Sequence, residues 1–309
     1  MKENDYIEKL KKQHYHVVGR HSAVKICTWL KKSLRDQGTC YKQRFYGISS
    51  HRCLQMTPNI YCNQRCVFCW RTYDDNNDPI PSQWDEPEFI IEESIKAQRK
   101  LINGFPGAPG LNEQKFKEAQ NPNQVALSLT GEPMGYPYMG ELVEQFHKKG
   151  FTTFIVTNGL YPKRLAEMTL PTQLYVSLDA TDEQMHKVVN RPLVPDSWQT
   201  INETLELLPS LDTRKVIRMT VVKGWNDKNP EQYAKLIEKS EADFLEVKGY
   251  MFVGGSRQRL SMENMPRHDY VKQFAEKVNK YLGYDYIDEQ PVSRVVLYSS
   301  GKKNPKIKK

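Results

Sequence analysis

Three cysteines stand close together in the sequence, at Cys62, Cys66 and Cys69. Their C-x3-C-x2-C spacing is typical of a metal site, because cysteine thiolates bind zinc and iron–sulfur clusters. Structural zinc and cubic 4Fe–4S centres usually take four protein ligands, so three cysteines would leave one iron of a cluster open to a small molecule. The alternative interpretation is a zinc site that a distant fourth ligand completes.

A second set of three cysteines precedes this stretch, at Cys27, Cys40 and Cys53, with 13 residues from each to the next. All six cysteines of the chain therefore lie before residue 70. Buried free thiols are the alternative for this set, because cysteine packs as a small hydrophobic residue. Beside the first set, the grouping predicts a second cluster, again with one iron that no cysteine binds.

The chain of 309 residues carries 45 Lys and Arg against 37 Asp and Glu, a formal net charge of +8. A basic surplus permits a polyanionic partner such as RNA. The first residues contain no apolar leader segment, and no apolar run reaches the roughly 18 residues that a membrane span needs. We therefore expect a cytoplasmic protein with no membrane partner, in which clustered cysteines indicate metal binding or catalysis rather than disulfides.

Apolar β-type runs alternate with helical patterns over most of the chain. Helices that join successive strands require a parallel sheet. Six such units predict an α/β fold, a partial TIM-like (β/α)6 barrel, with a flat doubly wound sheet as the alternative. The predicted strands are residues 53–61, 124–130, 151–157, 173–178, 215–222 and 244–250, with a last strand at 294–298; the predicted helices are residues 87–101, 138–149, 162–168, 197–208, 230–240 and 268–282.

Shorter segments flank the barrel, which is assigned to residues 53–298. Residues 1–52 are predicted to be an N-terminal helical cap that carries cysteines of the second set, with helices over residues 6–15 and 24–34. Residues 299–309 are predicted to be a mobile basic tail that either contacts phosphates or only aids solubility.

Polar residues follow the ends of several predicted strands, where parallel α/β barrels gather their reactive groups. We therefore expect the chemistry in these loops, with plain turns and barrel filling as the alternatives. The residues are Gly131, Glu132 and Pro133 after the second strand, Asn158 after the third, Ser177 and Asp179 at the fourth, and Arg218 and Thr220 on the fifth.

Lys42 follows Cys40 by two residues. A lysine near a cation or in an apolar pocket loses its proton more readily and then forms a Schiff base with a carbonyl substrate. A solvated surface lysine is the alternative, and Lys25 and Lys248 are rival candidates.

Aromatic and basic residues interleave in three stretches, at residues 11–16, 70–73 and 254–259. Base stacking together with phosphate neutralisation needs this mixture of side chains. Ordinary protein surface is the alternative for each stretch taken singly.

The first set of cysteines resembles the signature of the radical S-adenosylmethionine (SAM) enzymes, in which SAM binds the open iron of a 4Fe–4S cluster. Phe68, an aromatic residue just before the last cysteine, strengthens the resemblance. Residues 130–133 are similar to the glycine-glycine-glutamate-proline segment of that family, with Thr130 in place of its first glycine. The resemblance implies that the backbone at Gly131, Glu132 and Pro133 receives the SAM amino group. Ser177 and Asp179 would contact the SAM ribose, and Asn158 the SAM ribose or carboxylate.

A narrower resemblance covers nearly the whole chain. Its stretches are similar to those of the archaeal 4-demethylwyosine synthases, radical SAM enzymes of the tRNA wybutosine pathway, and most of all to a methanogen member. These stretches are residues 13–15, 18–22, 31–33, 40–42, 45–48, 51–58, 69–71, 131–134, 151–159 and 250–254.

This resemblance implies a complete reaction. N1-methylguanosine, 3′ of the anticodon in tRNA-Phe, would receive two carbons from pyruvate and become tricyclic 4-demethylwyosine, the product of a carbon–carbon bond-forming lyase. The cluster on Cys62, Cys66 and Cys69 would cleave SAM to a 5′-deoxyadenosyl radical that removes hydrogen from the N-methyl group.

The same resemblance implies the other partners. The second 4Fe–4S cluster, on Cys27, Cys40 and Cys53, would orient pyruvate, and Lys42 would form the Schiff base with it. Electrons would come from a separate donor of the flavodoxin or ferredoxin type. Two rival functions remain: another radical SAM enzyme that acts on a protein or peptide, and a non-catalytic RNA-binding protein stabilised by metal.

Overall fold

The central sheet keeps its parallel strands in the order of the sequence. In this computed structural model, which describes residues 3–73, 81, 83–107 and 109–308, these strands are β3 (Cys53–Thr57), β4 (Gln124–Leu127), β5 (Thr152–Thr157), β6 (Gln173–Ser177), β7 (Arg214–Val221) and β8 (Phe244–Gly249). Antiparallel strands extend the sheet at both ends: β1 (His16–Val18) and β2 (Ser22–Val24) beside β3, and β10 (Val295–Ser299) and β9 (Asp285–Gln290) beside β8. The strands of the predicted βα units are confirmed.

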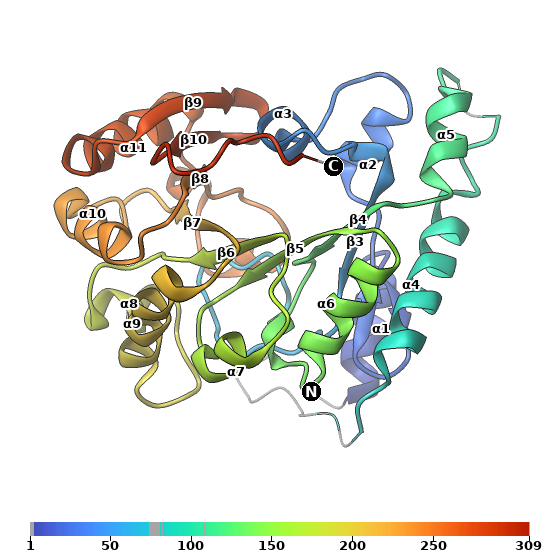
Figure 1. Cartoon of the computed structure of the whole chain (residues 1–309), viewed down its shortest axis with the longest axis horizontal. Helices are drawn as coiled ribbons and strands as arrows, with labels where there is room; N and C mark the ends of the chain where they lie inside the picture. Colours follow the sequence, from blue (N-terminus) through green and yellow to red (C-terminus); the bar gives the residue numbers. More distant parts are fainter. Residues whose placement is uncertain (1–2, 74–80, 82, 108, 309) are drawn as a thin grey trace.

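Helices join consecutive strands along the outside of the curved sheet (Figure 1). They are α4 (Pro87–Ile102), α5 (Glu113–Ala119), α6 (Met139–Lys148), α7 (Pro162–Glu167), α8 (Glu183–Val189), α9 (Ser197–Leu207), α10 (Pro230–Lys239) and α11 (His268–Leu282). The strand order does not reverse between β3 and β8, as it would in a doubly wound sheet, and within the described residues the sheet does not close on itself. The partial barrel is thus confirmed. No helix in the described ranges is long and apolar enough to cross a membrane.

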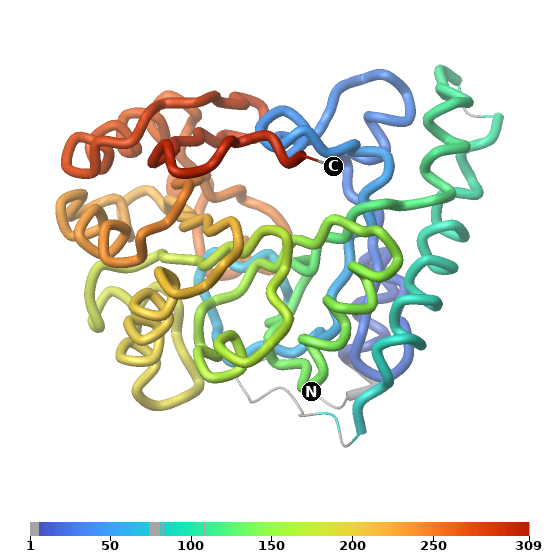
Figure 2. Tube along the Cα trace, viewed as in Figure 1, coloured from blue at the N-terminus to red at the C-terminus, as the bar shows by residue number. Residues whose placement is uncertain are grey.

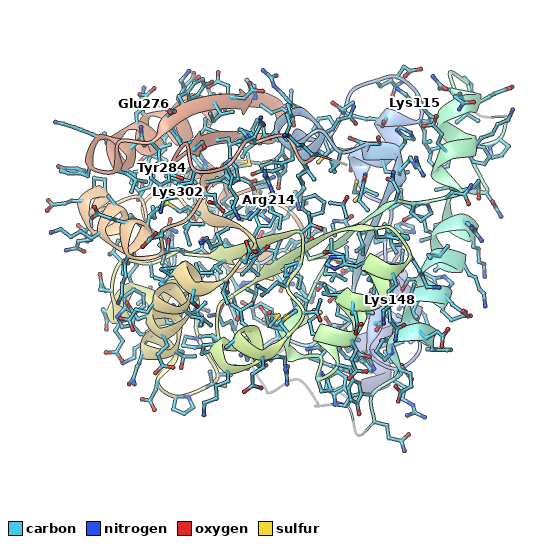
Figure 3. All side chains as sticks on the ribbon, in the orientation of Figure 1. Lys115, Lys148, Arg214, Glu276, Tyr284 and Lys302 are labelled. Carbon is cyan, nitrogen blue, oxygen red and sulfur yellow. The ribbon has the colours of Figure 1, made fainter. Side chains whose placement is uncertain are left out.

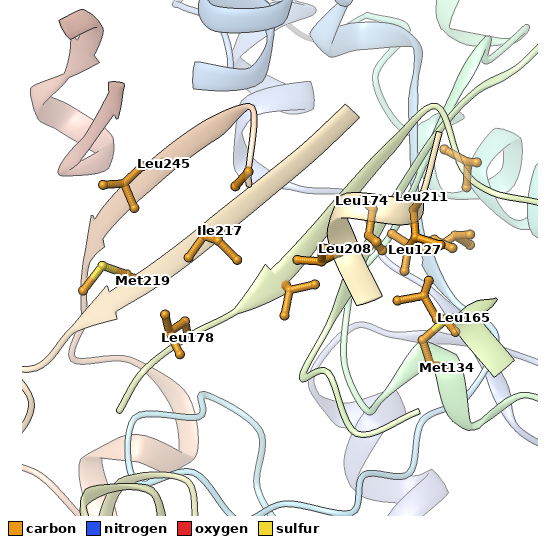
Figure 4. Close-up of a cluster of buried hydrophobic side chains, with 14 of the residues drawn as sticks. Leu127, Met134, Leu165, Leu174, Leu178, Leu208, Leu211, Ile217, Met219 and Leu245 are labelled. Atoms are coloured by element: carbon orange, nitrogen blue, oxygen red, sulfur yellow. The ribbon is translucent and has the colours of Figure 1, made fainter. Parts of the chain in front are cut away.

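Successive strand residues face two apolar layers, since side chains of a strand point alternately to opposite faces. Leu174 and Ile217 are buried between the sheet and the outer helices, and Figure 4 shows Leu174 beside Leu208 and Leu211. Tyr175 packs instead on the inner face, in a cluster with Phe45 of α3 (Tyr41–Tyr46). Burying one such side chain stabilises the fold by about 1.5–3 kcal/mol, so this layer holds α3 against the inside of the barrel.

The N-terminal region differs from its prediction. It contains α1 (Glu3–Lys12) and the antiparallel pair β1–β2, of which β2 pairs with β3. The predicted helix over residues 24–34 is wrong at its start, because residues 22–24 are fully buried as β2 and the helix α2 covers only Thr28–Ser33. The Cys27 thiol caps that helix by accepting the Leu30 N–H at 3.2 Å. The domain boundaries at residues 52 and 298 stay a prediction.

The prediction of a mobile basic tail is wrong for residues 302–307. Arg214 of β7 donates to the carbonyl oxygens of Asn304 and Pro305 at 2.8 and 2.7 Å. The Ile307 N–H donates to the Tyr46 carbonyl oxygen at 3.0 Å, so the segment runs beside α3, as Figure 2 shows. Arg214 and Lys302 lie along it in Figure 3. Backbone hydrogen bonds and the partly buried side chain of Ile307 hold a segment whose charge pattern alone indicated mobility.

Several short elements were not predicted. Strand β9 has mostly exposed or half-exposed, polar residues and carries no apolar alternation. Helix α3 is six residues long and gives too few turns for a periodic pattern. The short 3-10 turns are Ser50–Arg52, Pro133–Gly135, Leu208–Ser210, Gly254–Gln258, Met262–Asn264 and Pro291–Ser293.

Candidate active site

The loop that carries Cys62, Cys66 and Cys69 follows β3 and is held by a second loop after α8. The Arg65 N–H donates to the carbonyl oxygen of Asn190 at 3.1 Å, and the Val67 N–H donates to that of Val189 at 2.9 Å. The Leu193 N–H returns a bond of 2.9 Å to the Asn63 carbonyl oxygen. These backbone bonds fix the loop from both sides, so its thiols have a defined arrangement.

The thiols of this loop influence one another. Burial raises the pKa of Cys62 to about 12 and that of Cys66 well above its ordinary value, and neighbouring Cys69 raises both further. The Asn190 amide lies 3.6 Å from the Cys66 sulfur. Buried thiolates need a positive partner, which a bound iron–sulfur cluster supplies. The donor set fits such a cluster; Asn190, a single amide far along the chain, was not predicted to lie here.

Glu132 ties the second strand-end loop to the third. Its carboxylate accepts bonds from the Thr157 hydroxyl at 2.8 Å, the Met134 N–H at 3.0 Å and the Asn158 N–H at 2.8 Å. Gly131 has a φ of +69°, and a Cβ there would collide with the Asn59 carbonyl oxygen. Only glycine permits this approach, which brings residues 131–133 beside the backbone that enters the Cys62 loop.

Other predicted residues lie around the same loop. The Asn158 amide donates to Asn63 Oδ1 at 2.7 Å. Asp179 is buried, accepts the Thr220 N–H at 2.7 Å and interacts electrostatically with Cys66; burial raises its pKa to about 6. Ser177 is half-buried at the end of β6. A cavity of about 360 Å³ opens beside this loop, lined among others by Asn59, Tyr61, Cys62, Asn63, Trp84 and Tyr161.

Glu132 should make the stability of the folded chain depend on pH. Burial raises its pKa from 4.5 to about 7, so between these values the folded state holds the proton more tightly than the unfolded chain. The free energy of unfolding should therefore fall, by up to about 3 kcal/mol, as the pH rises through this window. The measurement is the free energy of unfolding by urea at about pH 5 and at about pH 7. The decrease between these two pH values should be smaller in Glu132→Gln than in the wild type, because glutamine does not titrate. Equal slopes for the two proteins would contradict the assignment.

The second set of cysteines meets in a separate cavity of about 280 Å³. It is lined by Cys27, Cys40 and Cys53, together with Lys42, Arg218, Lys248 and the aromatic rings of Trp29, Tyr41 and Trp70, among others. Burial raises the pKa of Cys27 to about 11, with a further contribution from Cys40. The fold thus brings together three thiols that were evenly spaced in the sequence. Among the described residues, no three His, Cys, Asp or Glu side chains have a geometry that could hold a single metal ion.

Lys42 is buried beside these thiols, with 7% of its surface exposed. Its ammonium group lies 4.4 Å from the ring centre of Tyr175 and 4.8 Å from that of Phe154. Burial lowers the pKa of Lys42, although nearby Glu246 opposes the shift. Burial likewise lowers the pKa of Lys248 to about 8. Both lysines therefore suit imine chemistry.

The third candidate, Lys25, lies elsewhere. Its ammonium group stands 4.4 Å from the ring centre of Tyr15 and 5.6 Å from that of Trp70. The cavity lining includes Lys42 and Lys248. The structure thus separates Lys25 from the two lysines beside the second set of cysteines.

One carboxylate faces the basic groups of this cavity. Glu246 of β8 is fully buried, and its Oε1 lies 3.6 Å from Arg218 Nε. Tyr46 donates to Glu246 Oε2 at 3.3 Å. Arg218 keeps 23% of its side chain exposed, although it sits on a central strand, because it lines the cavity. Three basic side chains against one acid leave a positive surplus that suits an anion.

Comparisons with known proteins identify the family. Residues 56–237 match the radical SAM superfamily, and residues 239–300 match a family described as wyosine base formation. A Pyrococcus horikoshii protein named S-adenosyl-L-methionine-dependent tRNA 4-demethylwyosine synthase is 57% identical over 297 residues, which cover 94% of this chain and 87% of that protein. The chain belongs to this family.

Other members of the 4-demethylwyosine synthase family agree in sequence and in structure. The Methanocaldococcus jannaschii protein of the same name is 40% identical and covers 96% of this chain and 97% of its own. Both relatives are archaeal, as expected, and the Pyrococcus protein is more similar to this chain than the Methanocaldococcus protein is. A solved structure, "Structure of TYW1 with a lysine-pyruvate adduct bound", is 38% identical with a TM-score of 0.89 over 98% of both chains. "Crystal structure of archaeal TYW1" has 35% identity and a TM-score of 0.82 over 98% and 99%.

Proposed function

We propose that this chain is a tRNA 4-demethylwyosine synthase, which joins two carbons of pyruvate to N1-methylguanosine 3′ of the anticodon in tRNA-Phe. In the classification of enzymes it would be a carbon–carbon lyase of the cytoplasm. The observation that carries this proposal is the cavity lined by Cys27, Cys40, Cys53 and the buried Lys42, and also by Trp70, which directly follows Cys69. A radical enzyme with one cluster has no need of such a second set of thiols.

Cys62, Cys66 and Cys69 would hold the 4Fe–4S cluster whose open iron binds SAM. When bound, this cluster and SAM together would supply a carbon-centred radical that removes a hydrogen atom from the N1-methyl group. Backbone groups at Gly131, Glu132 and Pro133 would receive the SAM amino group, since the buried Glu132 side chain is already occupied in joining the two loops. Asn158, Ser177 and Asp179 would contact the rest of SAM from the neighbouring strand ends.

The electron that starts each turnover must come from outside the chain. Amino-acid side chains do not store low-potential electrons, whereas flavins and iron–sulfur proteins do. We therefore assign this role to a separate protein of the flavodoxin or ferredoxin type.

Cys27, Cys40 and Cys53 would hold a second 4Fe–4S cluster beside pyruvate. The neutral Lys42 amine would attack the keto carbon, water would leave, and the C=N bond of a Schiff base would form. The depth of burial favours the neutral amine that this attack needs. A lysine–pyruvate adduct in the similar TYW1 structure supports the proposal.

Arg218 should bind the carboxylate of pyruvate. It lines the cavity with Lys42, and its charge-assisted bonds to a carboxylate are worth about 1.5–3 kcal/mol. Arg218→Gln should therefore raise the KM for pyruvate about 10- to 100-fold. Because this change leaves Glu246 buried without its ion partner, the double variant Arg218→Gln/Glu246→Gln should be measured beside it. An unchanged KM in both variants would exclude this role.

The test of the proposed function is a reaction with the anaerobically reconstituted protein. SAM, a reductant, pyruvate and N1-methylguanosine-containing tRNA should give 5′-deoxyadenosine and the tricyclic base, and the protein should hold about eight irons. Failure to form the tricyclic base with full iron content would overturn the proposal. About one zinc and no iron would instead favour the RNA-binding alternative.

A further inference from the structure

The three stretches of interleaved aromatic and basic residues meet in space around Trp70. The Tyr15 ring centre lies 6.4 Å from that of Trp70. From the first stretch also, Gln13 donates to the Thr72 hydroxyl at 3.3 Å. From the third, the Arg259 guanidinium lies 4.3 Å from the ring centre of Tyr73. Each stretch taken alone could be ordinary protein surface. Their convergence on one exposed indole is not typical of ordinary surface.

The backbone beneath Trp70 is held firmly. The Gly255 N–H donates to the Trp70 carbonyl oxygen at 2.7 Å. Gly254 has a φ of +58°, and a Cβ there would collide with that same oxygen. Arg259 donates to the carbonyl oxygens of Val67 and Cys69. The segment over residues 254–259 thus fixes the backbone position of Trp70, while 39% of the Trp70 surface stays exposed.

Trp70 also links the two sets of cysteines. It directly follows Cys69, and its side chain lines the cavity that contains Cys53 and Lys42. Trp70 is thus partly exposed to solvent and at the same time lines a cavity that holds three thiols and a buried lysine. Lys25 stands 5.6 Å from the centre of the Trp70 ring and adds the positive charge that a phosphate or a purine edge favours.

We propose that Trp70 is the stacking platform for the tRNA purine that reacts, once that base has left its own stack. The inference rests on the proposed function. A base inside a folded anticodon loop cannot reach a cavity beside buried thiols, so it must be extruded and held. An aromatic ring replaces the lost stacking of neighbouring bases without reading sequence, and an indole offers the largest surface for this.

The test compares Trp70→Phe with Trp70→Leu in the full-length, cluster-loaded protein. Both side chains fill space, but only phenylalanine stacks. Loss of one stacked base should weaken apparent affinity for N1-methylguanosine tRNA about 5- to 150-fold in Trp70→Leu, whereas Trp70→Phe should stay within a few-fold of the wild type. Iron content is matched among all proteins, so a disturbed Cys69 ligand does not enter the comparison.

A second readout follows the base itself. A tRNA with 2-aminopurine next to N1-methylguanosine becomes more fluorescent when its neighbour unstacks. Wild type and Trp70→Phe should raise this fluorescence, and Trp70→Leu should not. The control is Trp198→Ala, which removes an indole of α9 that contacts His186. A wild-type fluorescence rise and affinity in Trp70→Leu, or equal losses in the Phe and Leu variants, would overturn the role of Trp70. Absence of the tricyclic product in the wild type would instead overturn the proposed function.

Discussion

A Cys66→Ala variant should produce no detectable 5′-deoxyadenosine from SAM, with or without tRNA. Cys66 is the middle thiol of the loop after β3, and its sulfur contacts the side-chain amides of Gln64 and Asn190. Without it, the cluster that binds SAM would keep two cysteine ligands and would not be retained in its four-iron form. The measurement is deoxyadenosine formation after anaerobic reconstitution with excess reductant.

Iron analysis distinguishes this result from general unfolding. The variant should keep about four of about eight irons, because Cys27, Cys40 and Cys53 lie in a different cavity. SAM cleavage at wild-type iron occupancy would refute the role of Cys66 as a ligand. Loss of all iron would show that the two centres do not assemble independently, and a Cys66→Ser variant would then be needed to separate the ligand from the fold.

A Lys42→Ala variant should form no 4-demethylwyosine and no covalent adduct with pyruvate. The buried amine is the proposed attacking group, and alanine has no nucleophile to replace it. The measurement is borohydride reduction in the presence of pyruvate, followed by mass mapping of the modified peptide. The expected loss of product is complete, because the Schiff base is a covalent step that no solvent group supplies.

The matched variants are Lys42→Arg and Lys248→Ala. Arginine keeps the positive charge beside the Tyr175 and Phe154 rings but does not form a Schiff base, so it should fail as alanine does. Lys248 lines the same cavity, and Lys248→Ala should still give the adduct on Lys42. A reduced pyruvate adduct found on Lys248 in the wild type would show that Lys248, on β8, is the nucleophile instead.

The long-range order of the fold could be predicted because its signals are local. Each of β4 to β8 contains several apolar residues close together, and a helix of ten or more residues follows β3, β4, β6, β7 and β8. The cysteine loop could be located for the same reason, since its three cysteines lie within residues 62–69. Even spacing grouped Cys27, Cys40 and Cys53 correctly in one cavity.

What the sequence did not predict depends on partners distant along the chain. Asn190 lies beside Cys66 although 124 residues separate them, and no pattern around Asn190 indicates it. The pairing of Arg218 with Glu246 comes from the register of β7 and β8, which spacing alone does not fix. The aromatic stretches were recognised one by one, but their meeting at Trp70 is a property of the folded chain.

The segment over residues 302–307 has a consequence for the order in which the site is completed during synthesis. Helix α3, which carries Lys42 and begins just after Cys40, bonds to Asp288 through Arg44 and to Ile307 through Tyr46. These contacts come from residues translated after every parallel strand. While the chain is still emerging from the ribosome, Lys42 on α3 and Cys40 at its N-cap therefore lack these contacts. The loop with Cys62, Cys66 and Cys69 is held instead by residues 189–193 and 255–259, all of which are translated before Asp288 and Ile307. This loop can therefore take its shape before α3 is fixed in place.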